Sequence, residues 1–172
     1  MKRIVQPEIL DTLSPADPLA IHSRRDLRRV NSWMRNHVTM ADALQNVLNH
    51  QAPGQITELG AGDGNFLLRV AQKLSPAWPN VTTTLVDWQQ NVAAETLVAF
   101  AGLGWRTHTL EADVFDWLQT RTVSEVIITN LFLHHFEDGR LQEMLRLSDP
   151  DNRDSGLGHI FCHLQCSIAR SK

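Results

Sequence analysis

The residues best suited to binding a ligand lie in one short stretch of the chain. It holds an acid and three glycines at alternate positions: Glu58, Gly60, Gly62 and Gly64. Apolar residues before it indicate a buried strand, and the apolar spacing over residues 66–74 indicates an amphipathic helix after it. Glycines permit sharp turns that bring a ligand close to the backbone. The helix amino terminus adds unpaired N–H groups and partial positive charge.

Glu58 bears on which ligand suits this turn. The dinucleotide fingerprint is G-x-G-x-x-G, but here the third glycine comes one position early and Asn65 stands in its place. A carboxylate two residues before the first glycine would repel a pyrophosphate. The same carboxylate could accept hydrogen bonds from a cationic ligand, directly or through water.

The pattern E-x-G-x-G-x-G after a strand resembles the first motif of class I S-adenosylmethionine (SAM)-dependent methyltransferases. SAM carries an amino group and a sulfonium but no phosphate. The resemblance implies SAM as the cofactor. The cofactor-binding residues that it implies in this stretch are Glu58, Gly60, Ala61, Gly62 and Gly64.

A second acid follows the next predicted strand, residues 81–86. Asp87 can accept hydrogen bonds from both hydroxyls of a ribose. Because SAM enzymes and nicotinamide enzymes both use an acid here, Asp87 indicates a nucleoside-containing ligand without choosing between them. Trp88 either packs on an adenine ring or is a partly buried core aromatic. A helix is expected over residues 89–101.

A third acid follows the predicted strand at residues 105–110. In the resembled family, an acid at this place contacts the adenine amino group and its apolar neighbour stacks on the ring. The resemblance implies these roles for Asp113 and for Val114 or Phe115. Asp113 also fits the N-cap of a helix over residues 114–118, and a cap can coexist with a ligand contact.

The fourth predicted strand, residues 123–130, ends at Asn130. The sequence N-L-F-L-H-H-F that starts there resembles the N-x-x-L-H-H segment of small-molecule methyltransferases. The resemblance implies that Asn130 and Leu131 lie at the cofactor. Because strands one and four flank the switch point, we also expect Leu133 or His134 at the edge of the cofactor and His135 facing the substrate. If the reaction needs a base, His135 is the first candidate and His134 the second. The alternative for both histidines is structural, with one half-buried and the other solvated. The absence of an N-P-P-Y motif favours a small-molecule acceptor.

The elements that position these residues predict a doubly wound, mostly parallel α/β sheet of the Rossmann-like methyltransferase type, with right-handed crossovers. We expect an N-terminal helical lid over residues 1–52, a SAM-binding core over 53–148 and an atypical tail over 149–172 that could hold a fifth strand. Four arginines of the lid form either a solvated helix face or a cap that meets an acidic substrate: Arg24, Arg25, Arg28 and Arg29.

Composition sets the remaining bounds. A chain of 172 residues predicts one domain, and no apolar run is long enough to span a membrane. The net charge of −3 gives no argument for nucleic-acid binding. The two cysteines, without a signal-peptide core, favour a reducing cytoplasm.

The tail also raises a metal hypothesis. On one helix, four residues would form two i, i+4 pairs of zinc-type ligands: His159, Cys162, His163 and Cys166. Zinc sites usually draw their ligands from separated segments, so we predict no metal site.

The predicted function is SAM-dependent methyl transfer to a small-molecule acceptor by direct displacement. A second hypothesis is a non-catalytic or partner-dependent SAM-binding fragment, because the family's final strands have no sequence here. The sheet edge left exposed would then be covered by an oligomer or another partner. A nicotinamide-dependent oxidoreductase is a third hypothesis, against which the glycine spacing and Glu58 both count.

Overall fold

The computed structural model describes residues 36–120, 126–148 and 160–164 of the chain. In chain order the elements are α3 (Asn36–Val47), β1 (Gln55–Leu59), α4 (Asn65–Leu74), β2 (Thr82–Asp87), α5 (Ala94–Gly102), β3 (Arg106–Glu111), α6 (Val114–Thr120), β4 (Val126–Asn130), the 3-10 turn η1 (Leu133–His135), α7 (Asp138–Ser148) and β5 (Ile160–Leu164).

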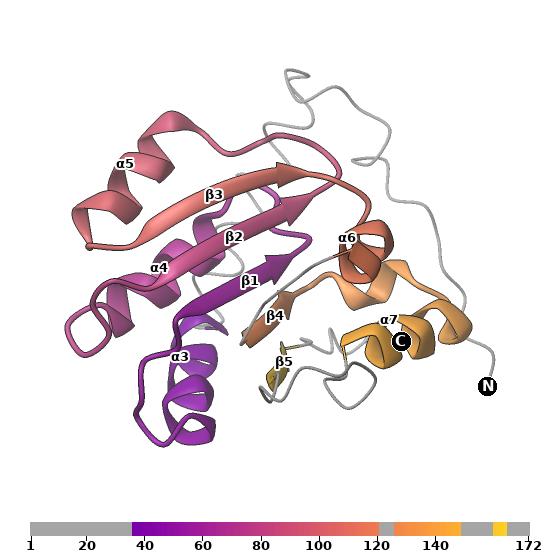
Figure 1. Ribbon diagram of the computed structural model, residues 1–172, viewed down its shortest axis with the longest axis horizontal. Coiled ribbons are helices and arrows are strands. Elements are labelled where there is room, and N and C mark those ends of the chain that lie inside the picture. Colours follow the sequence, from indigo (N-terminus) through magenta and orange to yellow (C-terminus); the bar gives the residue numbers. More distant parts are fainter. Residues whose placement is uncertain (1–35, 121–125, 149–159, 165–172) are drawn as a thin grey trace, which may run out of the picture.

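The strands form one parallel sheet in the order β3-β2-β1-β4-β5 (Figure 1). Leu59 of β1 lies opposite Val86 of β2 and Thr129 of β4, and Asp87 lies opposite Glu111. The carboxyl ends of β1 to β4 therefore reach the same edge of the sheet. The chain winds outward from β1 in one direction and then from β4 in the other, which places the switch point between β1 and β4. The predicted doubly wound α/β fold is confirmed.

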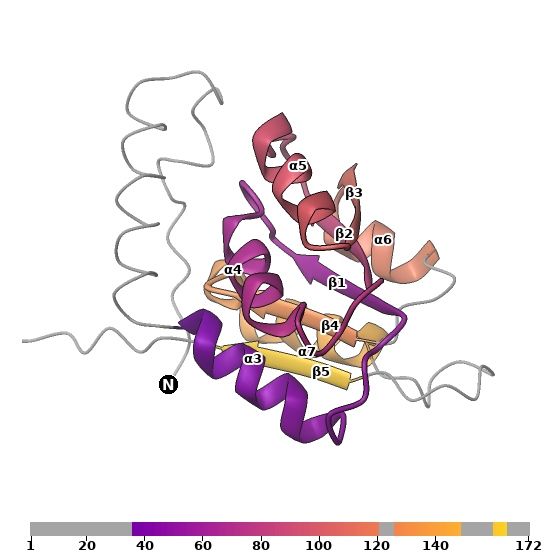
Figure 2. The same ribbon diagram turned by 90° about the vertical axis from the view of Figure 1, so that its left-hand side faces the viewer.

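Side chains along each strand point alternately to the two faces of the sheet, so the buried side chains form two cores, one on each face. Ile56 of β1 packs with residues of α3, α4 and α5, whereas Leu59 packs with residues of α6 and α7. β1 and β4, at the centre of the sheet, are therefore buried on both faces. Figure 2 shows the sheet between α3, α4 and α5 on one side and α6 on the other.

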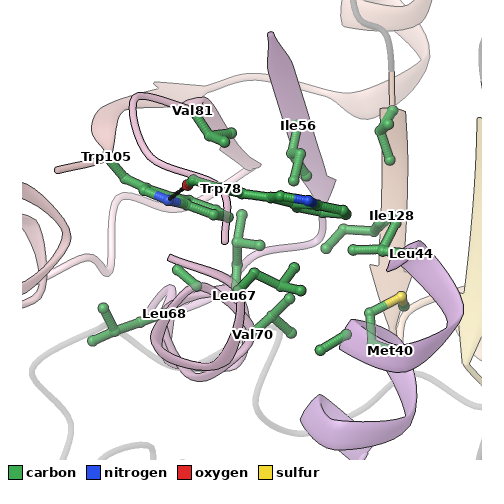
Figure 3. Packing of buried hydrophobic residues seen from close by; sticks show 14 of the residues in the cluster. Met40, Leu44, Ile56, Leu67, Leu68, Val70, Trp78, Val81, Trp105 and Ile128 are labelled. Carbon is green, nitrogen blue, oxygen red and sulfur yellow. Dashed lines mark hydrogen bonds between the residues drawn. The ribbon is translucent and has the colours of Figure 1, made fainter. Parts of the chain in front are cut away.

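Two tryptophans fill the first core (Figure 3). The indole N–H of Trp105 donates to the backbone carbonyl of Trp78 at 2.9 Å, and the indole N–H of Trp78 donates to the carbonyl of His50 at 3.1 Å. Both buried donors are therefore satisfied, which a buried indole requires. Phe100 of α5 stacks on Trp105 with ring centroids 6.5 Å apart.

The N-terminal part of the chain is described from α3 onward. Met40, Ala41 and Leu44 are fully buried in the first core, and Asp42 forms an ion pair of 2.8 Å with Lys73 of α4. This helix is thus part of the layer that covers the sheet. Residues 1–35 of the predicted lid, with its four arginines, lie outside the described residues.

One difference from the sequence predictions concerns the start of a helix. α5 begins at Ala94 and not at residue 89, because the Asp87 carboxylate accepts the Gln89 N–H at 3.0 Å and Ala93 is extended. The predicted fifth strand is confirmed over Ile160–Leu164, parallel to β4. Cys162 and His163 lie in this strand, so the helical arrangement of the metal hypothesis is wrong for them, while His159 and Cys166 lie outside the described residues. Among the described helices, none is long and apolar enough to cross a membrane.

Candidate functional site

The glycine-rich loop joins β1 to α4 with φ angles of 67°, 55° and 72° at Gly60, Gly62 and Gly64. A Cβ added at Gly60 would lie 2.2 Å from Cδ2 of Phe132, and one at Gly64 would lie 2.8 Å from Cδ1 of Leu85. A Cβ at Gly62 would meet no atom of the described chain within 4 Å. Packing therefore requires glycine at position 60, whereas Gly64 is crowded by the end of the Leu85 side chain and Gly62 leaves the backbone open on its outer side.

The first half of the loop donates its backbone N–H groups to β2. Gly60 and Ala61 both donate to the carbonyl of Val86, at 2.9 and 3.1 Å. Gly62 donates to Oδ2 of Asp87 at 2.8 Å. These three bonds hold the loop against the carboxyl end of β2.

The second half of the loop donates its backbone N–H groups to acceptors within the loop. Gly64 donates to the carbonyl of Ala61 at 2.9 Å, and Asn65 donates to Oδ1 of Asp63 at 3.1 Å. A phosphate cradle needs backbone N–H groups that point to the ligand. Here five such groups, from Gly60, Ala61, Gly62, Gly64 and Asn65, are already donated to protein acceptors. The loop therefore suits a ligand other than a pyrophosphate.

Glu58 lies beneath this loop and is 1% exposed. Its Oε2 accepts no hydrogen bond from the described residues. Burial raises the pKa of Glu58 well above its usual range, the negative charge of Asp63 raises it further, a hydrogen bond from the backbone N–H of Leu67 lowers it, and Asp87 raises it. The neutral carboxyl is thus favoured as long as no positive charge lies nearby.

Asp87, at the tip of β2, holds the backbone of the loop and can also accept hydrogen bonds from a ligand. Its Oδ2 holds Gly62 and its Oδ1 holds Gln89, each through one backbone N–H. A carboxylate oxygen can accept more than one hydrogen bond, so these contacts leave acceptor capacity for a ligand. Trp88 beside it is 58% exposed. The core-aromatic interpretation of Trp88 is therefore wrong, and stacking on an adenine stays a prediction.

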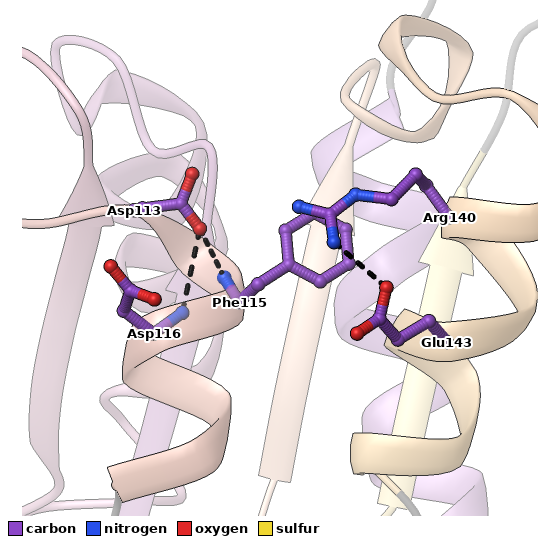
Figure 4. Close-up of polar contacts among 5 residues, drawn as sticks. All are labelled: Asp113, Phe115, Asp116, Arg140 and Glu143. Carbon is purple, nitrogen blue, oxygen red and sulfur yellow. Dashed lines mark hydrogen bonds and ion pairs between the residues drawn. The ribbon is translucent and has the colours of Figure 1, made fainter.

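Asp113 caps α6 (Figure 4). Its Oδ1 accepts the backbone N–H of Phe115 at 2.7 Å and that of Asp116 at 3.4 Å. This is the N-cap arrangement that the sequence offered as one of two compatible roles. Both bonds use Oδ1, and Oδ2 receives no hydrogen bond from the described residues. The adenine contact stays a prediction for Oδ2.

Two substitutions test the capping role of Asp113 without any ligand. Asp113→Ala should lower the free energy of unfolding by about 1 kcal/mol, because two N–H groups of α6 lose their acceptor. Asp113→Asn keeps an acceptor oxygen and should restore most of that loss. Urea unfolding of the three proteins measures the difference. Equal destabilisation by both substitutions would contradict a capping role.

The apolar neighbours of Asp113 belong to the second core. Val114 and Phe115 are buried, and the Arg140 guanidinium lies 3.4 Å from the centre of the Phe115 ring (Figure 4). Arg140 also forms an ion pair with Glu143 at 2.8 Å. One face of the Phe115 ring is therefore covered by a cation from α7.

The segment after β4 reaches the glycine loop at the switch point. Leu131 has a φ of 51°, which is uncommon for a residue with a side chain, and Phe132 then lies against Gly60. His134 and His135 follow in η1 with ring centroids 4.1 Å apart, and both are half-buried. Asn130 is buried at the end of β4.

Two residues of this region carried no signal in the sequence. Phe132 fills the space over Gly60, and Asn36 of α3 donates from Nδ2 to Oδ1 of Asn130 at 3.5 Å. Asn36 and Asn130 are 94 positions apart. Such a contact arises only in the tertiary structure, where α3 packs beside α4 and β5 and its first residue reaches the end of β4. By contrast, the predicted residues at the tips of β1, β2 and β4 do meet at one edge of the sheet.

No protein-family model and no curated protein matches this sequence. Among solved structures, the chain is similar to a candidate O-methyltransferase from Nostoc punctiforme, with 24% identity and a TM-score of 0.48. It is also similar to the plantazolicin methyltransferase BpumL, in complex with SAH and a monoazolic desmethylPZN analog (20% identity, TM-score 0.49) and with SAH alone (21%, 0.49).

These similarities cover part of each chain. The first covers 62% of this chain and 31% of the Nostoc protein. The other two cover 76% of this chain and 48% and 49% of BpumL. The chain thus spans between 31% and 49% of the length of the solved proteins that it resembles.

Proposed function

We propose that this chain binds SAM at the carboxyl edge of its sheet and transfers the methyl group to a small-molecule acceptor by direct displacement. One observation carries the proposal: the glycine loop donates its N–H groups to acceptors of the protein and is surrounded by acids, one of them buried with an unpartnered oxygen. Such a loop suits a nucleoside with positive charge. A dinucleotide phosphate would find few donors there and would meet three carboxylates.

The chemical groups of the residues at this site match those of SAM. Glu58 would offset the positive charge of the ligand, and Gly62 would allow its close approach to the backbone. Asp87 would accept the ribose hydroxyls and Asp113 would accept the adenine amino group. The proposed remaining cofactor contacts are Gly60, Ala61, Gly64, Trp88, Val114, Asn130 and Leu131.

When bound, SAM supplies a methyl group on a sulfonium that a nucleophile can displace. The contribution of this chain is to orient the acceptor in line with that bond and to exclude water. Positioning of this kind can be worth about 7–11 kcal/mol, whereas a general base adds about 10²–10⁴-fold. If the acceptor must lose a proton, we propose His135 as the base, with His134 second. Both lie in η1, directly after the strand that flanks the switch point.

Calorimetry with SAM and with NAD tests the cofactor class. We expect SAM to bind with 1:1 stoichiometry and NAD to give no measurable heat, because the loop lacks open donors for a pyrophosphate. Binding of NAD without binding of SAM would overturn the proposal in favour of a nicotinamide enzyme. Methyl transfer is a separate measurement, in which labelled SAM is incubated with a panel of small hydroxyl, amine and thiol acceptors.

A further inference from the structure

The acids at the glycine loop differ in their surroundings. Asp87 has a backbone N–H on each oxygen and Asp63 accepts the N–H of Asn65, and both are half-buried. Glu58 is buried, and its Oε2 has no partner among the described residues. An unpaired charge at such a position is costly, so the carboxyl needs either a proton or a cation beside it.

No cation supplied by the described chain meets this need. The charged groups that act on Glu58 are Asp63 of the loop and Asp87 of β2, and both are acidic. From α4 comes only the backbone N–H of Leu67. The missing positive charge would have to come with a ligand.

We propose that Glu58 is neutral in the ligand-free protein and loses its proton when SAM binds, so that cofactor binding and proton release are one linked event. This inference rests on the proposed function. In the step, the neutral carboxyl and the cationic ligand give a complex of carboxylate and cation, and the proton leaves to the buffer. No bond of SAM changes.

The linkage fixes the direction of the pH dependence. Burial and the two acidic neighbours raise the pKa of Glu58, so over a range above the usual pKa of a glutamate the ligand-free carboxyl holds a proton that the complex does not. In that range SAM binds more tightly as the pH rises, by up to about tenfold per pH unit. The affinity then becomes constant once Glu58 is ionised before the ligand binds.

The test is calorimetry at about pH 6.5, where the amino group of SAM keeps its proton. Wild-type protein is titrated with SAM in phosphate and in imidazole buffer, whose ionisation enthalpies differ. We expect SAM binding to release protons, up to one per SAM. Glu58→Gln should release none, because its amide cannot ionise. Glu95→Gln, at an exposed position of α5, is the matched control and should release as much as the wild type.

Adenosine, a neutral nucleoside, should bind to the wild type without proton release. If Glu58→Gln does not fold, the pH dependence of the wild-type dissociation constant for SAM decides the question. A constant affinity from about pH 5 to 7, where the amino group of SAM stays protonated, or SAM binding without proton release, would overturn this inference and leave the proposed function standing. Release that persists in Glu58→Gln would also overturn it. A failure of SAM to bind at any pH would instead overturn the proposed function.

Discussion

Asp87→Ala should weaken SAM binding by about 10- to 100-fold, the loss expected when charge-assisted hydrogen bonds to a ligand are removed. Two effects contribute. The ribose hydroxyls lose their proposed acceptor, and the loop loses the bond of 2.8 Å that fixes the N–H of Gly62. Calorimetry with wild type and variant measures the change. Asp42→Ala is the matched control, since Asp42 pairs with Lys73 away from the loop.

A comparison of two nucleoside ligands, one of which lacks a ribose hydroxyl, separates the two effects of Asp87. If Asp87 accepts the ribose hydroxyls, the wild type should bind adenosine more tightly than 2′-deoxyadenosine, and Asp87→Ala should lose this preference. If Asp87 only holds the loop, the variant should weaken both ligands by the same factor. A wild-type protein that does not distinguish the two nucleosides would contradict the ribose assignment.

Gly60→Ala should lower the free energy of unfolding by about 2–5 kcal/mol. A left-handed backbone costs an alanine about 1–2 kcal/mol, and the φ of Gly60 is 67°. The added Cβ would also lie 2.2 Å from Cδ2 of Phe132, an overlap that typically costs about 1–3 kcal/mol. Urea unfolding at equilibrium measures the sum.

Gly62→Ala is the matched control for this prediction. Its φ of 55° is as unfavourable, but a Cβ there meets no atom of the described residues within 4 Å. It should therefore cost only the backbone part, about 1–2 kcal/mol. Phe132→Leu in the Gly60→Ala background should recover part of the difference. Equal losses for the two alanine variants would mean that Phe132 moves away freely.

Local patterns in the sequence were sufficient for the order of the elements. The β-branched runs and the glycine turn predicted β1 and β2. The fifth strand was also predicted, although the residues around it show no regular pattern. The start of α5 was predicted five residues early. Its apolar stripe begins at Val92, but the carboxylate of Asp87 draws the Gln89 N–H into a turn. A side chain from β2 thus accepts the N–H of a residue that the sequence pattern had placed in the helix.

In the candidate site, too, the sequence predicts the residue types and the packing decides their contacts. The residue types at the strand tips, Glu58, Asp87 and Asp113, can be read along the chain because parallel strands bring their carboxyl ends to one edge. Their hydrogen bonds cannot be read in this way. The capping of α6 by Asp113, the hold of Asp87 on Gly62 and the burial of Glu58 each depend on how neighbouring elements pack.

The sequence by itself determined a parallel α/β sheet with acids after three of its strands, since strand periodicity and turn residues act over a few positions. Only the tertiary structure decided that the loop donates its N–H groups inward, that Phe132 covers Gly60 and that Glu58 has an unpartnered oxygen. These features arise where β1, β2 and β4 meet. Their physical reason is packing between segments far apart in the chain, which no local pattern records.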